Sequence, residues 1–220
     1  MATSGEKDAG GMTRSEVEAL GPEGRFTLVG DRYERMQELM TDAQLVVSDD
    51  EWKWKTPGFE ANGGATAYDP LAGANNDNAY YMSMVRAVHP EGAVGAVADA
   101  RPVYDYFVSQ GWEVSLTEND FSELELEATR DFKVQAITAD GYRVQYTVQQ
   151  NGQYNMEVLT DTFWGDSDEI IKNQLDRFPP GQPLFPRGLS PELSTQPGQS
   201  VPGVYTKYPK WSDPVLRSAD

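Results

Sequence analysis

The sequence predicts an α+β domain, in which two main helices pack on one face of a mostly antiparallel sheet that ends in a β-meander, followed by a Pro-rich C-terminal extension. Residues 130–164 contain three runs in which apolar and polar residues alternate, which is the period-2 pattern of half-buried strands. The dipeptides Asp140-Gly141 and Asn151-Gly152 separate these runs, and both suit tight hairpin turns. Two further stretches repeat apolar residues at helical spacing.

The length of 220 residues is consistent with one domain and extensions at both ends. Residues 1–23 combine Gly, Ser, Thr and charged residues, and we predict a flexible tether there. The domain is predicted to span residues 24–177. Residues 178–220 hold nine of the fourteen prolines and are expected to be extended. Because this tail also carries large apolar residues, we expect part of it to wrap over the domain.

The first helix is predicted over residues 32–48, because Asp31 and Glu34 have capping-box spacing and methionines follow at helical spacing. Trp52 and Trp54 alternate with charged residues, so both indoles are expected on one side of a short strand. Two interpretations follow for this pair. The rings either pack under the first helix or form a stacking platform for a sugar ring.

A long loop is predicted over residues 58–78, which are rich in Gly, Ala, Asn and Asp. Loops of this length are often functional, although the glycine spacing matches no phosphate-binding loop. Residues 79–88 are predicted to form a strand, and residues 92–110 a helix that is kinked or restarted at Pro102. The candidate binding residues from the two-Trp strand and the loop are Trp52, Trp54, Asn62, Tyr68 and Asn76.

The charge balance disfavours a nucleic-acid partner. Thirty-five acidic residues against eighteen basic ones give a net charge of -17, which would repel a phosphate backbone. The absence of cysteine excludes disulfides and thiolate metal sites, and the single histidine, His89, does not make a zinc site by itself. We therefore predict no cofactor and no metal. No apolar run approaches the length of a membrane span.

Carboxylates gather at residues 118–131 and again at residues 161–169. The first group lacks EF-hand spacing, and its alternating glutamates suit the solvated face of a strand. Within the second group, Asp166 and Glu169 have the spacing of a capping box and predict a short helix. The alternative interpretation is a hydrolase that uses two carboxylates in a cleft. Its candidates are Asp120, Glu123, Glu125, Asp161 and Asp166.

Three stretches form a recognisable pattern: the helix of residues 33–47 running into Glu51-Trp52-Lys53-Trp54, residues 104–111 before a strand, and Arg130-Asp131-Phe132-Lys133-Val134-Gln135 before Gly141-Tyr142-Arg143-Val144. In these stretches the sequence resembles the LppA-like lipoproteins of actinobacteria. Together they extend over about residues 25–164, and none of them is a catalytic motif. The Pro-rich tail is longer than the family pattern implies.

The resemblance implies an exported protein that is held at the cell membrane by a lipidated cysteine behind a signal peptide. Because this sequence has no cysteine, we expect it to represent the mature, signal-less form, with the anchor outside it. The expected function is that of a non-enzymatic, extracytoplasmic domain that binds an envelope protein or glycan. A cytosolic interaction module is the remaining alternative, since residues 1–11 contain no apolar signal core.

Overall fold

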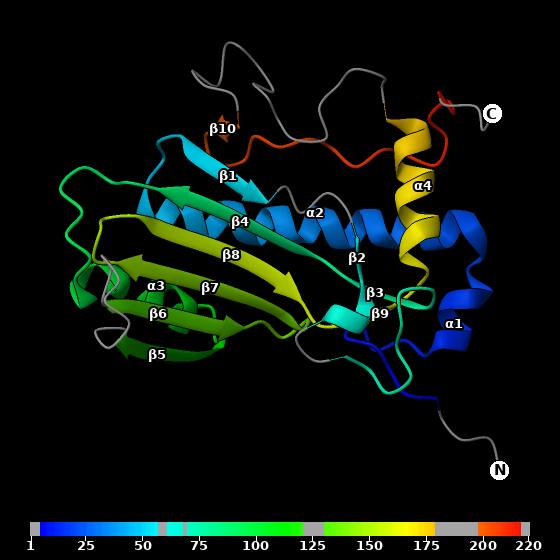
Figure 1. Cartoon of the computed structure of the whole chain (residues 1–220), viewed down its shortest axis with the longest axis horizontal. Coiled ribbons are helices and arrows are strands. Elements are labelled where there is room, and N and C mark those ends of the chain that lie inside the picture. Colours follow the sequence, from blue (N-terminus) through cyan, green and yellow to red (C-terminus); the bar gives the residue numbers. More distant parts are fainter. Residues whose placement is uncertain (1–4, 57–60, 68–69, 121–129, 179–197, 217–220) are drawn as a thin grey trace.

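The computed structural model describes residues 5–56, 61–67, 70–120, 130–178 and 198–216 (Figure 1). They form an α+β fold around a seven-stranded sheet in which every pair of neighbouring strands is antiparallel. In sheet order the strands are β10 (Gln199–Ser200), β1 (Trp52–Thr56), β4 (Ser83–Val88), β8 (Tyr154–Thr160), β7 (Tyr142–Gln149), β6 (Arg130–Ile137) and β5 (Glu113–Asp120). The predicted α+β class and antiparallel sheet are confirmed.

A second, three-stranded sheet consists of short strands. They are β2 (Asn62–Gly63), β3 (Ala79–Tyr81) and β9 (Phe163–Trp164), with the 3-10 turn η1 (Gly64–Thr66) beside them. The helices are α1 (Arg14–Ala19), α2 (Gly21–Val47), α3 (Val97–Ser109) and α4 (Ser167–Arg177). Among the described residues, no helix combines the length and the hydrophobicity that crossing a bilayer requires.

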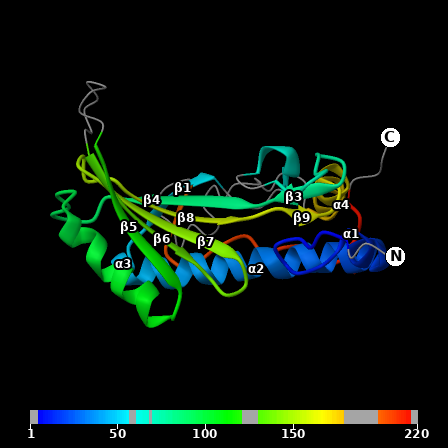
Figure 2. The ribbon, with the colours of Figure 1, turned by 90° about the horizontal axis from the view of Figure 1, so that it is seen from below.

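The meander of β6, β7 and β8 follows the predicted pattern. Gly141 and Gly152 adopt φ angles of 84° and 80°, so the two turn dipeptides supply the left-handed backbone that tight hairpins need. The apolar residues of each strand are buried on one face, where α2 and α3 cover the sheet (Figure 2). The main hydrophobic core lies between that face and these two helices.

Helix α2 is 27 residues long and begins at Gly21, well before the predicted start at residue 32. Pro22 stands in its first turn, and Phe26 and Val29 extend its buried stripe toward the N-terminus. The residues with capping-box spacing therefore lie inside the helix. Helix α3 is continuous through Pro102, its sixth residue, so the predicted restart at this proline does not occur.

The N-terminal residues that the structure describes are packed, which differs from the flexible tether predicted for residues 1–23. Thr13 and Glu16 form a capping box at the start of α1, and Val17 packs against Ala79 and Trp164. Asp8 is buried and accepts hydrogen bonds from three backbone N–H groups. Polar residues of this segment therefore make contacts within the fold, which the composition alone does not predict.

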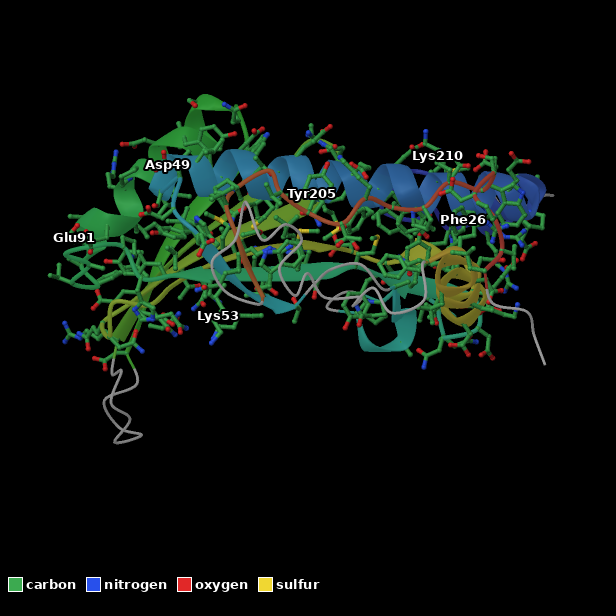
Figure 3. All side chains as sticks on the ribbon, turned by 90° about the horizontal axis from the view of Figure 1, so that it is seen from above. Phe26, Asp49, Lys53, Glu91, Tyr205 and Lys210 are labelled. Carbon is green, nitrogen blue, oxygen red and sulfur yellow. The ribbon has the colours of Figure 1, made fainter. Side chains whose placement is uncertain are left out.

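Residues 198–216, which we call the C-terminal strap, run along α2 (Figure 3). The strap begins in β10, which pairs with β1, and then places Tyr205 and Tyr208 against Tyr33 with ring centroids 6.2 and 5.8 Å away. Tyr208 also packs against Phe26 at 5.1 Å. The side chain of Tyr208 is thereby part of the core, whereas residues 179–197 lie outside the described residues.

Candidate functional site

The sheet face opposite α2 and α3 carries the polar half of each alternating strand, and we call it the polar face. The strand register defines its rows. Gln135 lies opposite Gln145, which lies opposite Glu157, so that these three side chains form one row across β6, β7 and β8. Lys133 belongs to the next row, and Arg143 to the row on the other side. Side chains in such cross-strand positions are close neighbours.

The polar face contains a hollow of about 470 Å³, which is within the size range of ligand sites. Its walls are formed by residues from β4, β6, β7 and β8 of the large sheet and by one residue from β3 of the small sheet. The lining residues are Tyr81, Ser83, Lys133, Gln135, Arg143, Gln145, Glu157 and Leu159. We call this site the polar hollow.

Most polar side chains of the polar hollow make no hydrogen bond or ion pair to the residues that the structure describes. Within the part of the chain that the structure describes, the side chains of Lys133, Gln135, Gln145 and Glu157 make no hydrogen bond or ion pair. Arg143 differs, because its guanidinium pairs with Asp161 through contacts of 3.0 and 3.3 Å. The hollow thus offers amide donors and acceptors, one ammonium and one carboxylate to a ligand.

Glu157 is the half-buried acid of the polar hollow. Burial raises the pKa of its carboxyl group, and the nearby Lys133 ammonium opposes that effect. A ligand hydroxyl or N–H that donates to Glu157 would replace the water that this carboxylate has lost. The hollow is therefore suited to a ligand with several hydrogen-bonding groups.

The two tryptophans that were candidate binding residues face the opposite way. Trp52 is fully buried in the core, and its Nε1 donates to the Ser48 carbonyl at 3.1 Å. Trp54 is buried beneath the Arg86 guanidinium, and its Nε1 donates to Ser200 Oγ at 2.7 Å. Trp52 packs in the core that contains the buried residues of α2, whereas Trp54 packs against Arg86 and Ser200. Lys53, which stands between the two tryptophans, lies on the solvated side of β1.

The two predicted asparagines do not line the polar hollow. Asn62 is exposed and pairs in register with Tyr81, which lines the hollow. The Asn76 side chain packs against Gly63, and its backbone oxygen accepts a hydrogen bond from Ser167 Oγ at 2.9 Å. Tyr68 lies outside the described residues. The residues that line the hollow are therefore different from the candidate binding residues of the loop.

The carboxylates of the hydrolase alternative do not converge in the described residues. Asp161 pairs with Arg143, and Asp166 caps α4 by accepting from the backbone N–H groups of Asp168 and Glu169. Asp120 lies 3.8 Å from Arg130, while Glu123 and Glu125 are outside the described residues. Within the described ranges, no group of three or more His, Cys, Asp or Glu residues could hold a metal ion.

Comparison with known proteins adds no relative: no protein-family model matches the chain, and no curated protein or solved structure matches it. The resemblance to LppA-like lipoproteins is consequently still a prediction that rests on the motifs quoted above.

Proposed function

We propose that this domain is a non-enzymatic binding module of the cell envelope, and that its polar face takes a glycan or protein partner. The observation that carries the proposal is the polar hollow, in which four polar side chains converge without a hydrogen bond or ion pair to the described residues. Side chains that only solubilise a sheet face gain nothing from being half-buried, since burial of unpaired polar groups costs free energy. A partner that supplies the missing hydrogen bonds offsets this cost.

A glycan fits this chemistry first. Each sugar hydroxyl both donates and accepts, and the amides of Gln135 and Gln145 can do the same. Lys133 adds a donor and Glu157 an acceptor, so that one ring with several hydroxyl groups could use all four side chains. The net charge of -17 argues against a polyphosphate ligand.

A protein partner is the second candidate, because the polar face extends beyond the polar hollow. A second hollow of about 540 Å³ lies over β1 and β4 and includes Lys53, Lys55 and His89. The two hollows together make the polar face long enough for an extended ligand, and longer than a single small molecule needs. Either a longer glycan or a peptide chain could cover both.

The binding test compares two Gln→Ala variants. Gln135→Ala removes an amide from the polar hollow, whereas Gln110→Ala removes one beside the C-terminal end of α3, away from the polar face. We expect the wild type to bind envelope glycans or envelope proteins in calorimetry. Gln135→Ala should bind a few-fold to about tenfold more weakly, the equivalent of one hydrogen bond, and Gln110→Ala should bind as the wild type does.

Equal loss in both variants, or binding that neither variant changes, would contradict the placement of the site. Hydrolysis of an envelope glycan or peptide by the wild type, lost in Asp161→Asn or Asp166→Asn, would instead favour the hydrolase alternative. A competition experiment distinguishes a glycan ligand from a protein ligand, because it measures whether purified glycan alone displaces the bound partner.

We also propose that the full-length protein is lipid-anchored outside the cytoplasm. The support is the resemblance of residues 25–164 to the LppA-like pattern, in which a lipidated cysteine precedes the domain. Expressing the native gene in its host with labelled palmitate should give a labelled, detergent-soluble protein. An unlabelled protein in the cytosolic fraction would overturn this proposal and favour the cytosolic interaction module.

A further inference from the structure

Lys53 and Lys133 stand in one row of the polar face. In the strand register this row crosses β1, β4, β8, β7 and β6, and it consists of Lys53, Ala87, Asn155, Thr147 and Lys133. Four strand spacings separate the two lysines, which places their Cα atoms about 19 Å apart. Lys53 lines the second hollow, and Lys133 lines the polar hollow. The row therefore connects the two hollows across the strands.

The lysines of this face are free, whereas most basic side chains in the described residues form an ion pair with a carboxylate. Within the same described residues, Lys53, Lys55 and Lys133 make no ion pair and no side-chain hydrogen bond. Lys53 and Lys55 are both exposed on the solvated side of β1, and Lys53 points away from α2 (Figure 3). Their ammonium groups are therefore available to a ligand.

The carboxylates that line the two hollows are placed differently from the lysines. In the second hollow, Asp50 accepts a hydrogen bond from Ser48 Oγ at 2.8 Å, and Glu51 also has a partner. The carboxylate that lines the polar hollow is Glu157 of β8, a strand that lies between β1 and β6 in the sheet. Because like charges repel, a ligand with negative groups has to place them beside the lysines and its uncharged hydroxyl groups beside Glu157.

We propose that the polar face binds an extended glycan with well-separated carboxylate groups, in which Lys53 and Lys55 hold one carboxylate and Lys133 holds another. This inference rests on the binding function proposed above and specifies the class of ligand. Each ammonium group donates up to three hydrogen bonds to an anion, and hydroxyl groups of the sugars between the carboxylates bind Gln145 and Glu157. The net charge of -17 disfavours a densely charged polyanion, whereas three lysines suffice for a few single charges.

The position of the polar hollow favours a glycan over a peptide strand. An extended peptide that adds to a sheet bonds the free backbone groups of an edge strand. The polar hollow lies over β4, β6, β7 and β8, and none of these is an edge strand of the large sheet. A ligand in this position meets side chains rather than free backbone groups. Hydroxyl and carboxylate groups bind such side chains directly.

The first experiment compares two forms of one glycan in calorimetry with the full chain. Hyaluronan oligosaccharides carry a carboxylate on every second sugar, and methyl esterification removes the charge but keeps the sugar chain. The acidic form should bind about tenfold more tightly than the ester at low ionic strength, and sodium chloride should reduce this difference. Equal binding of both forms would overturn the inference and leave the proposed glycan binding intact. Binding of neither form would also overturn it, while the comparison of Gln135→Ala with Gln110→Ala on other partners still decides the proposed function.

The second experiment locates the two carboxylates with the same acidic glycan. Lys53→Gln and Lys133→Gln remove charges that form no ion pair in the described residues, so the unfolding temperature should not change. Each should weaken binding about two- to fivefold, and the double variant about tenfold, because the effects of distant sites on the binding free energy add. Lys210→Gln removes an exposed lysine of the C-terminal strap and should bind as the wild type does. An effect of only one of the two substitutions, or an equal effect of Lys210→Gln, would overturn the inference.

Discussion

Arg32 and Asp8 form a buried ion pair, in which Arg32 Nη2 lies 3.4 Å from Asp8 Oδ2. Arg32 also donates to the Tyr80 hydroxyl at 2.6 Å, and its guanidinium lies 3.7 Å from the centroid of the Phe163 ring. The carboxylate of Asp8 in turn accepts backbone hydrogen bonds from its own loop and from Trp164. The pair therefore joins the N-terminal segment, α2 and the small sheet.

Replacing Asp8 tests whether this junction holds the N-terminal segment. We expect Asp8→Asn to lower the free energy of unfolding by about 3–5 kcal/mol, because the buried Arg32 would lose its countercharge. Glu18→Gln is the matched control, since it breaks the exposed pair with Arg14 and should cost no more than about 1 kcal/mol. Urea unfolding measures both. Equal effects would mean that Asp8 is not buried in solution.

Tyr154 fixes the start of α3 to the sheet. Its hydroxyl donates to Asp99 at 2.5 Å and accepts from the Gly95 N–H at 3.1 Å. Tyr154→Phe leaves both partners without this hydroxyl, so we expect a loss of about 1–3 kcal/mol of stability. Backbone amides of residues 95–99 should also exchange hydrogen faster than in the wild type.

The control for Tyr154→Phe is Tyr104→Phe, because Tyr104 lies on α3 itself. The Tyr104 hydroxyl makes no hydrogen bond to the described residues, so its removal should change stability by less than about 0.5 kcal/mol. If the two variants lose the same stability, the hydroxyl of Tyr154 does not anchor α3.

The meander could be predicted from sequence because its signals are local. Alternation decides which residues share a face, and Gly141 and Gly152 permit the turns between strands. The start of α2 could not be predicted in the same way. Residues with the spacing of a cap at Asp31 and Glu34 lie within the helix, where Glu34 instead binds Lys207 of the strap at 2.9 Å. That contact joins residues far apart in the chain.

The polar hollow could be predicted only in part. The period of the strands places Gln135 and Gln145 on a solvated face, but it does not reveal that the face is hollowed or that these side chains make no hydrogen bond to the described residues. The alternation of Arg86 with Met82 and Met84 indicates the core side of the strand. Its charge, however, gives no sign that this position tolerates a buried guanidinium.

Glu157 of the polar hollow makes the stability of the folded chain depend on pH. Because burial raises the pKa of its carboxyl group, the folded state favours the protonated form. The resulting stability is fully present below the unfolded pKa of about 4.3 and is lost as the pH rises through the folded pKa. Glu157→Gln, which resembles the protonated form, should therefore be at least as stable as the wild type at neutral pH.

Unfolding free energies of both proteins between about pH 3 and pH 8 would check this sign. The advantage of Glu157→Gln should shrink as the pH falls below the folded pKa, where Glu157 of the wild type is itself protonated. Carbon NMR of the Glu157 carboxyl group would give its pKa directly. A Glu157→Gln protein that is less stable at neutral pH would show that the carboxylate makes a stabilising contact.

Gly30 and Tyr208 provide a test of how the C-terminal strap is held. A Cβ at Gly30 would lie 2.9 Å from Tyr208 Cδ1, which is closer than such atoms approach without a shift. The Tyr208 ring is packed against Phe26 and Tyr33 and so has little room to move. Gly→Ala inside a helix normally stabilises by about 0.5–1 kcal/mol. Here, Gly30→Ala should destabilise the wild type because it displaces the strap.

The sign should reverse once the ring is removed. Tyr208→Ala alone should cost about 3–5 kcal/mol, as for other buried aromatic residues. Adding Gly30→Ala to Tyr208→Ala should then restore about 0.5–1 kcal/mol, because only the helix propensity of alanine remains. A double-mutant cycle in urea measures the difference between the two backgrounds. If Gly30→Ala stabilises both backgrounds equally, Tyr208 does not lie against α2 in solution, and the strap is not part of the core.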